Sequence, residues 1–252
     1  MTWRNLVRRM LPLALRQNVA QWRRQVRDYP LGAQLMPRHA VNLPDSWQLL
    51  AEIRQPVMPS TLLENKLINL RLGANKLNLA LIEPHAICSF WRHVGRPVAQ
   101  NGFMVGRNLV EGELTRQVGG GLCQLSSILY HLGLRSGLEV VERHAHSIDI
   151  YQEHERFTTL GADATVVWGY KDLRLCNPHP LAILLEFEVH SDALVGRSWI
   201  NMPLRPCEVT FEREQLGPEQ VRVHTLVDGR TLAQTLYKQR PGLALPTARQ
   251  SS

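Results

Sequence analysis

Long apolar runs are missing from this chain of 252 residues, and no stretch approaches the ~20 apolar residues that a membrane-spanning helix needs. The apolar run from Met10 to Leu15 is shorter than the core of a secretory signal, which takes roughly 7–15 residues. Arg16 follows this run instead of a small-residue cleavage site. We therefore expect a cytoplasmic protein that is at most peripheral to the membrane.

Cysteine is scarce, and its spacing argues against a zinc knuckle. The four cysteines form no C-x-x-C pair and are widely separated, at Cys88, Cys123, Cys176 and Cys207. This pattern gives little support for a disulfide framework. A run of three glycines lacks the Lys-Ser/Thr that completes a phosphate-binding P-loop. Internal repeats, low-complexity segments and a specific nucleic-acid motif are absent as well.

Acidic residues are nearly absent from the first 28 residues, although the whole chain carries a net charge of only +7. Asp28 is the one acidic residue there, and apolar residues alternate with seven arginines: Arg4, Arg8, Arg9, Arg16, Arg23, Arg24 and Arg27. The pattern predicts an amphipathic helix that lies on an anionic membrane surface or docks on a protein partner. The alternative is a basic extension packed on its own domain.

The most informative stretch is residues 119–130, where three glycines precede a helical pattern. Glycine permits positive φ angles and close backbone approach, and the apolar positions that follow have the spacing of one helix face: Leu125, Ile128, Leu129 and Leu132. Cys123 therefore lies at a helix start, where unpaired N–H groups and the helix dipole favour a thiolate. Ser136 and Gly137 form a typical helix end.

Two histidines and an aspartate follow this helix. Residues 138–151 have the pattern of a strand that carries His144 and His146 on one face. Residues 161–168 have the pattern of another strand, and a hairpin near His154 would place Asp163 beside His146.

Cysteine, histidine and aspartate in this order are the components of a thiol nucleophile with its base and orienting carboxylate. Cys123 is the expected nucleophile, with His146 or alternatively His144 as the base and Asp163 as the orienting group. Gln124 and the N–H groups near the cysteine would form an oxyanion hole. The structural alternatives are a cysteine that only packs the helix, buried histidines with satisfied hydrogen bonds, an aspartate that caps a turn, and glycines that serve close packing.

The motifs G-G-G-L-C-Q-L-S-S-I-L-Y, E-R-H-A-H-S and G-A-D-A-T-V, which start at residues 119, 142 and 161, resemble the VanW-like family. The resemblance extends more weakly over residues 60–190. The family is named from a component of vancomycin-resistance gene clusters, so the resemblance implies a link to the cell wall or the glycopeptide response. The motifs also mark further supporting or alternative site residues: Gln124, His144, Arg143, Ser147, Gly121 and Ser126.

The expected fold is α+β, with a central helix that carries the cysteine and packs on an antiparallel sheet. This arrangement is distantly similar to that of transglutaminase-like and papain-like thiol enzymes. We expect a basic helical extension with a proline-rich connection over residues 1–59, a main domain over 60–205, and a hairpin-rich segment with a disordered tail over 206–252. Individual elements are predicted as helices over 45–54 and 62–72, the second ended by Gly73, and strands over 79–82, 87–90, 102–110, 173–175, 181–189 and 221–227.

Three functions remain open at the level of sequence. The first is a thiol-dependent hydrolase or acyltransferase that acts on an amide or ester without a cofactor. The second is a zinc site with nitrogen, sulfur and oxygen ligands from Cys123, His144, His146 and Asp163. The third is a non-catalytic accessory domain that binds a partner.

Overall fold

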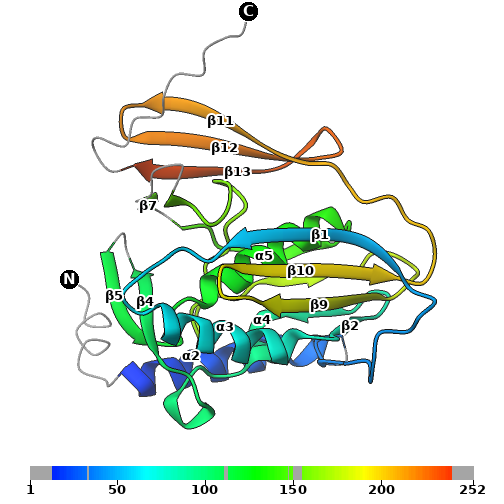
Figure 1. Cartoon of the computed structure of the whole chain (residues 1–252), viewed down its shortest axis with the longest axis horizontal. Helices are drawn as coiled ribbons and strands as arrows, with labels where there is room; N and C mark the ends of the chain where they lie inside the picture. Colours follow the sequence, from blue (N-terminus) through cyan, green and yellow to red (C-terminus); the bar gives the residue numbers. More distant parts are fainter. Residues whose placement is uncertain (1–12, 33, 111–112, 147, 150–154, 240–252) are drawn as a thin grey trace, which may run out of the picture.

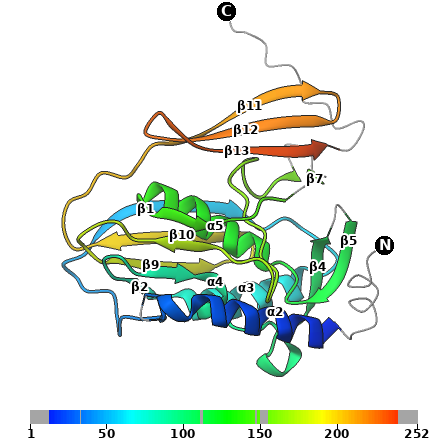
Figure 2. The ribbon, with the colours of Figure 1, turned by 180° about the vertical axis from the view of Figure 1, so that it is seen from behind.

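The computed structural model of the protein describes residues 13–32, 34–110, 113–146, 148–149 and 155–239. It is a mixed α and β structure whose sheets are mostly antiparallel. Figures 1 and 2 show helix α2 (Leu13–Asp28) along one edge and strands β11 to β13 along the opposite edge, with the main sheet and its helices between them. None of the helices in these ranges is long and apolar enough to cross a membrane.

The main sheet has four antiparallel strands in the order β1 (Gln48–Pro56), β10 (Ala193–Ile200), β9 (Ile183–Val189) and β2 (Leu81–Ile82). Helix α3 (Leu63–Leu77) packs on β9, and helix α5 (Leu122–Arg135) packs on β1 and β10. The central helix therefore lies on an antiparallel sheet, as the sequence predicted. The opposite face of the sheet is charged, with Arg197 on β10 paired to Glu52 and Glu188.

Smaller elements surround this core. A three-stranded sheet contains β3 (Ile87–Ser89), β8 (Arg174–Cys176) and β6 (Glu139–Glu142), and a two-stranded ribbon contains β4 (Val105–Val110) and β5 (Glu113–Val118). Short helices are α4 (Phe90–Val94), η1 (Tyr29–Leu31) and η2 (Ala99–Asn101). The ribbon leads directly into the glycine run before α5.

The C-terminal sheet consists of β11 (Val209–Gly217), β12 (Gln220–Val227), β13 (Arg230–Gln239) and the short β7 (Ile148–Asp149), which is parallel to β13. A hairpin joins β12 to β13 within the segment expected to be rich in hairpins, with positive φ angles of 48° at Asp228 and 74° at Gly229. Strand β7 comes from the segment after the histidines, so this sheet is joined to the central part of the chain.

One predicted helix is a strand. Residues 45–54 were expected to be helical, but β1 occupies Gln48–Pro56 and pairs with β10. Ala51, Ile53 and Gln55 are buried while Glu52 and Arg54 between them are exposed, which is the two-residue period of a strand. A bulge between Leu49 and Ala51 interrupts this period at the start of the strand and obscures it in the sequence.

The predicted helix stop at Gly73 is also wrong, because α3 continues to Leu77. A Cβ atom at Gly73 would lie 2.7 Å from Leu125 and 2.9 Å from Leu122, both on α5. This glycine permits close packing of two helices instead of ending one.

The two strands predicted around the histidines and the aspartate are not continuous strands. His144 and His146 lie in an irregular segment between β6 and β7, and residues 161–166 form no strand. One backbone hydrogen bond, from the N–H of Thr165 to the carbonyl of His144, joins the two segments at 2.6 Å. Side chains make the other contacts that hold the second segment in place. The hairpin near His154, the tail beyond residue 239 and residues 1–12 lie outside the described residues.

Candidate active site

The start of α5 is built by three glycines, each of which is needed for a physical reason. Gly119 and Gly121 have φ angles of 81° and 100°, a region that favours glycine. A Cβ atom at Gly120 would lie 2.2 Å from the backbone of Gly106 on β4. Asn69 on α3 fixes the turn further by donating a hydrogen bond of 2.8 Å to the carbonyl of Gly120.

Cys123 lies in the first turn of α5 and faces a cavity of about 350 Å³. The cysteine is half-buried, and its Sγ is 4.0 Å from Asn108 Oδ1 and 3.9 Å from the carbonyl oxygen of Val166. His146 and Asp163 line the same cavity. The structure therefore gathers the three residues that the sequence assigned to a nucleophile, a base and an orienting carboxylate.

His146 and Asp163 form a buried pair. The ring Nδ1 of His146 is 2.9 Å from Asp163 Oδ2, and the backbone N–H of His146 donates to the same oxygen at 2.7 Å. Burial alone would lower the pKa of His146, but the hydrogen bond to Asp163 and the interaction with Cys123 outweigh it and raise the pKa to about 10. Nδ1 is thus the nitrogen that donates to the carboxylate, which leaves Nε2 for other chemistry.

The carboxylate of Asp163 is held from its other side by Arg143 and Tyr237. Tyr237 on β13 donates its hydroxyl to Asp163 Oδ1 at 2.5 Å, and Arg143 lies 3.2 Å from that oxygen. Burial would raise the pKa of Asp163, but the hydrogen bond to His146 and the charges of His146 and Arg143 lower it well below its usual range. Asp163 is therefore ionised, and its partners hold the carboxylate in one orientation.

Arg143 also fixes the backbone around this aspartate. Its guanidinium donates to the carbonyl oxygens of Asp163 at 2.9 Å and of Gly161 at 3.0 Å, and to the Thr235 hydroxyl at 2.8 Å. It stacks on the ring of Tyr130, 4.9 Å from the ring centroid. One arginine thus joins α5, the segment that carries Asp163 and the C-terminal sheet.

Comparison with known proteins shows the family to which the site-bearing part of the chain belongs. The family model of VanW like proteins matches residues 65–199, which include Cys123, His146 and Asp163. The chain belongs to the VanW-like family. A curated relative, the "Vancomycin B-type resistance protein VanW" of Enterococcus faecalis (strain ATCC 700802 / V583), is 31% identical over 134 residues. YoaR of Bacillus subtilis (strain 168) is 32% identical over 127 residues.

These two matches cover 53% and 50% of the chain, and 49% and 40% of the relatives. The chain thus spans about half or less of the length of the curated relatives that it matches. No solved structure matches the chain. The resemblance to transglutaminase-like and papain-like enzymes consequently has no support from a structural neighbour.

Two serines of the VanW-like motif place Asp163 next to the helix. Ser126 donates to the carbonyl of Ala164 at 2.6 Å, and Ser127 accepts from the N–H of Ala164 at 3.0 Å while donating to the carbonyl of Cys123 at 2.6 Å. Both serines are buried. Ser126 is thus a supporting residue that positions the aspartate segment, and Ser127 is a partner that the sequence analysis missed.

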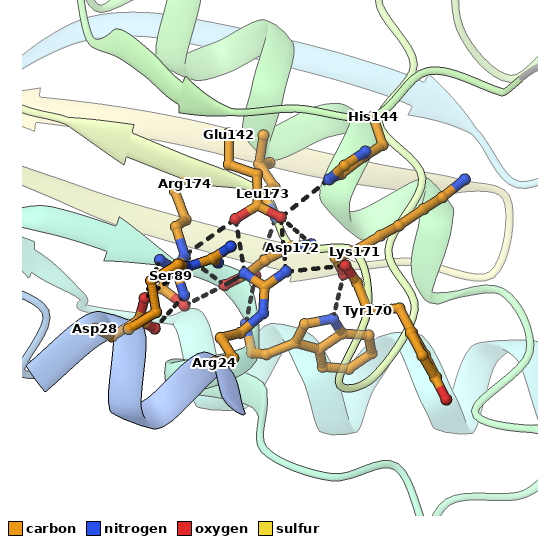
Figure 3. Close-up of polar contacts among 12 residues, drawn as sticks. Arg24, Asp28, Ser89, Glu142, His144, Tyr170, Lys171, Asp172, Leu173 and Arg174 are labelled. Atoms are coloured by element: carbon orange, nitrogen blue, oxygen red, sulfur yellow. Dashed lines mark hydrogen bonds and ion pairs between the residues drawn. The ribbon is translucent and has the colours of Figure 1, made fainter. Parts of the chain in front are cut away.

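His144, the alternative base, is turned away from the cavity. Its Nε2 is 3.0 Å from Glu142 Oε1, and Figure 3 shows its ring directed at the ion pairs around Glu142 and Arg24. His144 is absent from the cavity lining. The structure therefore brings His146, and not His144, to the cysteine.

Other predicted site residues have different positions. The Gln124 side chain is buried and donates to the carbonyl of Pro56 at 2.9 Å, so it is directed at β1 and not at the cavity, contrary to its predicted place in an oxyanion hole. Gly121 lines the cavity as the residue before the helix. Ser147 lies outside the described residues.

The four residues of the alternative zinc site do not form one cluster. Among the described residues, no group of three or more His, Cys, Asp and Glu side chains has an arrangement suited to a metal ion. His144 binds Glu142, and both oxygens of Asp163 already accept hydrogen bonds from the chain.

Sequence reasoning missed Tyr237, Lys66, Arg107 and Asn108 as cavity residues. Asn108 and Arg107 lie on β4, Lys66 on α3 and Tyr237 on β13. Lys66, Arg107 and Asn108 lie within the residues 65–199 that the family model matches, whereas Tyr237 lies beyond them. A sequence signal was thus available for Lys66, and only the fold brings Tyr237 to the site.

Proposed function

We propose that this VanW-like protein is a thiol-dependent acyltransferase or hydrolase that acts on an amide or ester. The observation that carries the proposal is that Cys123, His146 and Asp163 line one cavity, with His146 Nδ1 directed at a fixed carboxylate. A cysteine that only packed the helix would not need an ionised histidine and aspartate pair beside it.

In the proposed reaction, the Cys123 thiolate attacks the substrate carbonyl carbon and forms a C–S bond. The C–N or C–O bond breaks as the His146 imidazolium gives its proton to the leaving amine or alcohol. Water or an acceptor amine then attacks the thioester, passes its proton to His146 and releases Cys123 as a thiolate. Asp163 keeps the imidazole in the required tautomer and does not itself change protonation.

The first turn of α5 supplies a group for the oxyanion. Leu122 and Gln124 donate their backbone N–H groups to Gly119 and Gly121, whereas that of Cys123 has no acceptor among the described residues. A free N–H at a helix start stabilises negative charge on an attacked carbonyl oxygen. We assign the oxyanion role to this backbone group in place of the Gln124 side chain.

The name of the enterococcal relative supports a role in the glycopeptide response, and we extend this to a cell-wall peptide or ester as substrate. The cysteine on a helix start, followed by histidine and aspartate, also resembles the arrangement of transglutaminase-like and papain-like enzymes. This resemblance supports the chemistry and not a shared substrate.

The test is acylation of the purified protein by p-nitrophenyl acetate, followed by mass spectrometry of the modified peptide. We expect one acetyl group on Cys123, with release of p-nitrophenol in a burst. Cys123→Ala and His146→Ala should each abolish the burst, and Asp163→Asn should weaken it less completely.

Cys176→Ala is the matched control, because this cysteine is half-buried on β8 outside the cavity. It should leave the burst unchanged. A burst that persists in folded Cys123→Ala would refute nucleophilic catalysis. Stoichiometric zinc in protein purified without chelator, with a thiol protected from iodoacetamide, would favour the metal site instead.

A further inference from the structure

We propose that Lys66 and Arg107 form a carboxylate-binding subsite beside Cys123, so that the substrate carries a carboxylate close to the acyl group. This proposal deepens the proposed function and rests on it. Lys66 comes from α3 and Arg107 from β4, and both line the cavity that contains Cys123.

Lys66 packs against the glycine turn that precedes α5 and Cys123. A Cβ atom at Gly121 would lie 2.9 Å from Lys66 Cγ, so the stem of the lysine packs on the residue before the helix. Its Nζ lies 6.0 Å from the centroid of the Phe157 ring. Burial, with a smaller contribution from the charge of Arg107, lowers the pKa of Lys66 to about 8. The lysine is thus a cation in a partly desolvated place, which an anionic ligand would stabilise.

Three other charged groups of the cavity, Arg156, Asp149 and Asp163, form ion pairs within the chain. Arg156 pairs with Asp149, and Asp163 is bound by Arg143 and His146. Glu155 adds a negative charge at an exposed position. Within the described ranges, neither Lys66 nor Arg107 has a carboxylate within 4.0 Å, which is the longest separation among the ion pairs of the protein.

The cavity dimensions restrict the ligand to a small one. Its volume of about 350 Å³ is at the lower end for small-molecule pockets. A short peptide with a terminal carboxylate, or one residue with a carboxylate side chain, fits this volume and charge. The cations would orient this group while Cys123 attacks the neighbouring carbonyl.

The first test measures binding without catalysis. In folded Cys123→Ala protein, thermal stabilisation by N-acetylglycine is compared with that by N-acetylglycinamide, which lacks only the carboxylate charge. We expect stabilisation by the acid alone, its loss in Lys66→Gln and its weakening in Arg107→Gln. Lys76→Gln is the control, because Lys76 is exposed on the same helix away from the cavity. Equal stabilisation by both probes, or an undiminished effect in Lys66→Gln, would overturn the subsite.

The second test uses the thiol and separates the two proposals. Cys123 of the unmodified protein is alkylated with iodoacetate or iodoacetamide, and the ratio of the two rates is measured. Lys66→Gln should lower this ratio several-fold, and Lys76→Gln should not. A carboxylate effect in both tests without acetyl transfer to Cys123 would leave the subsite intact and refute the proposed catalysis.

Helix α2 buries its polar face and exposes its apolar face. Arg24 lies 2.6 Å from Glu142 on β6, and Asp28 lies 2.5 Å from Arg174 on β8. Figure 3 shows both residues of the helix directed into this network of buried ion pairs. The opposite face presents side chains that are between 39% and 62% exposed: Leu15, Val19, Trp22 and Val26.

We infer that this face of α2 docks on an anionic membrane surface. The four apolar residues recur at helical spacing and form one stripe, with the exposed Arg23 and Arg27 beside it. Asp28, the single acid of the helix, is buried against Arg174, so the outer face carries positive charge alone. Apolar residues flanked by arginines suit the interface of an anionic bilayer better than a neutral partner.

The test is co-sedimentation of the full chain with vesicles. Vesicles of phosphatidylcholine with phosphatidylglycerol should bind the chain, and phosphatidylcholine alone should not. Trp22→Gln with Val26→Gln should reduce binding at least tenfold, whereas Leu232→Gln with Leu236→Gln, exposed on β13, should not. Binding that survives the α2 substitutions, or that is absent from anionic vesicles, would overturn the inference.

Discussion

At the scale of single residues, Asp163 is a buried charge in the candidate site that depends on hydrogen-bond donors from the chain. Its carboxylate is almost fully buried and accepts from Tyr237, Arg143 and His146. A buried charge is tolerated only when such partners compensate the loss of water. Each partner is therefore expected to affect both stability and the orientation of the imidazole.

Tyr237→Phe removes the hydroxyl that donates to Asp163 and leaves the ring in place. We expect the free energy of unfolding to fall by about 1–3 kcal/mol, since a buried charged acceptor loses a donor. Chemical denaturation measures this change. Tyr29→Phe is the control, because Tyr29 is 86% exposed. Equal stability of the two variants would contradict the role given to the Tyr237 hydroxyl.

The pair of His146 and Asp163 predicts how stability depends on pH. The pKa of His146 is raised from its ordinary 6.5 to about 10, so the native state holds this proton more tightly than the unfolded state. Its stabilisation is full below pH 6.5 and is lost as the pH rises toward about 10. The lowered pKa of Asp163 acts oppositely: its stabilisation is present above its ordinary pKa of 3.8 and is lost as the pH falls.

Urea unfolding across the alkaline window tests the histidine contribution. His146→Gln should be less stable than the wild-type protein at neutral pH, and the difference should shrink as the pH approaches about 10. His190→Gln, at an exposed histidine in the turn between β9 and β10 and outside the cavity, should show no such convergence. A constant difference at all pH values would indicate that the His146 proton does not contribute.

At the scale of elements, the turn before α5 connects Cys123 to the ribbon of β4 and β5. Gly120→Ala places a methyl group against the backbone of Gly106, which cannot move aside as a flexible side chain would. We expect a loss of about 1–3 kcal/mol or more in stability, as for other overpacked sites, together with reduced acylation of Cys123.

Gly217→Ala is the matched control for this turn, since an added Cβ there meets nothing within 4 Å. Its effect on the free energy of unfolding should stay within about 0.5 kcal/mol. Thermal denaturation and the acetylation burst measure the two effects. A Gly120→Ala protein as stable and as reactive as Gly217→Ala would show that close approach is not required.

At the scale of the whole molecule, the C-terminal sheet contributes to a site that otherwise belongs to the family domain. Tyr237 and Thr235 on β13 contact Asp163 and Arg143, and β7 extends the sheet beside His146. A chain truncated after residue 205 loses all these contacts. We expect it to unfold at lower temperature and to lose the acetylation burst, and an unchanged burst would show that residues 60–205 suffice.

Local sequence determined the start of α5. Glycines permit the positive φ angles of the turn before α5. The apolar spacing after them marks a helix face, so the helix position and the location of Cys123 were correctly predicted. His146 and Asp163 were expected to lie side by side and they do, but the two continuous strands that were the reason for this expectation do not form. The apolar period of a helix and the backbone freedom of glycine depend only on residues close together along the chain. Both can therefore be recognised in the sequence.

Contacts between distant segments decided the rest. Residues 45–54 became a strand because β10 offered a partner, and α3 continued through Gly73 because α5 packs against that glycine. The choice of His146 over His144 followed from Glu142, and the clamp on Asp163 came from Tyr237, 74 residues away. These outcomes depend on pairing and packing across the fold, where burial outweighs local propensity, so only the tertiary structure could decide them.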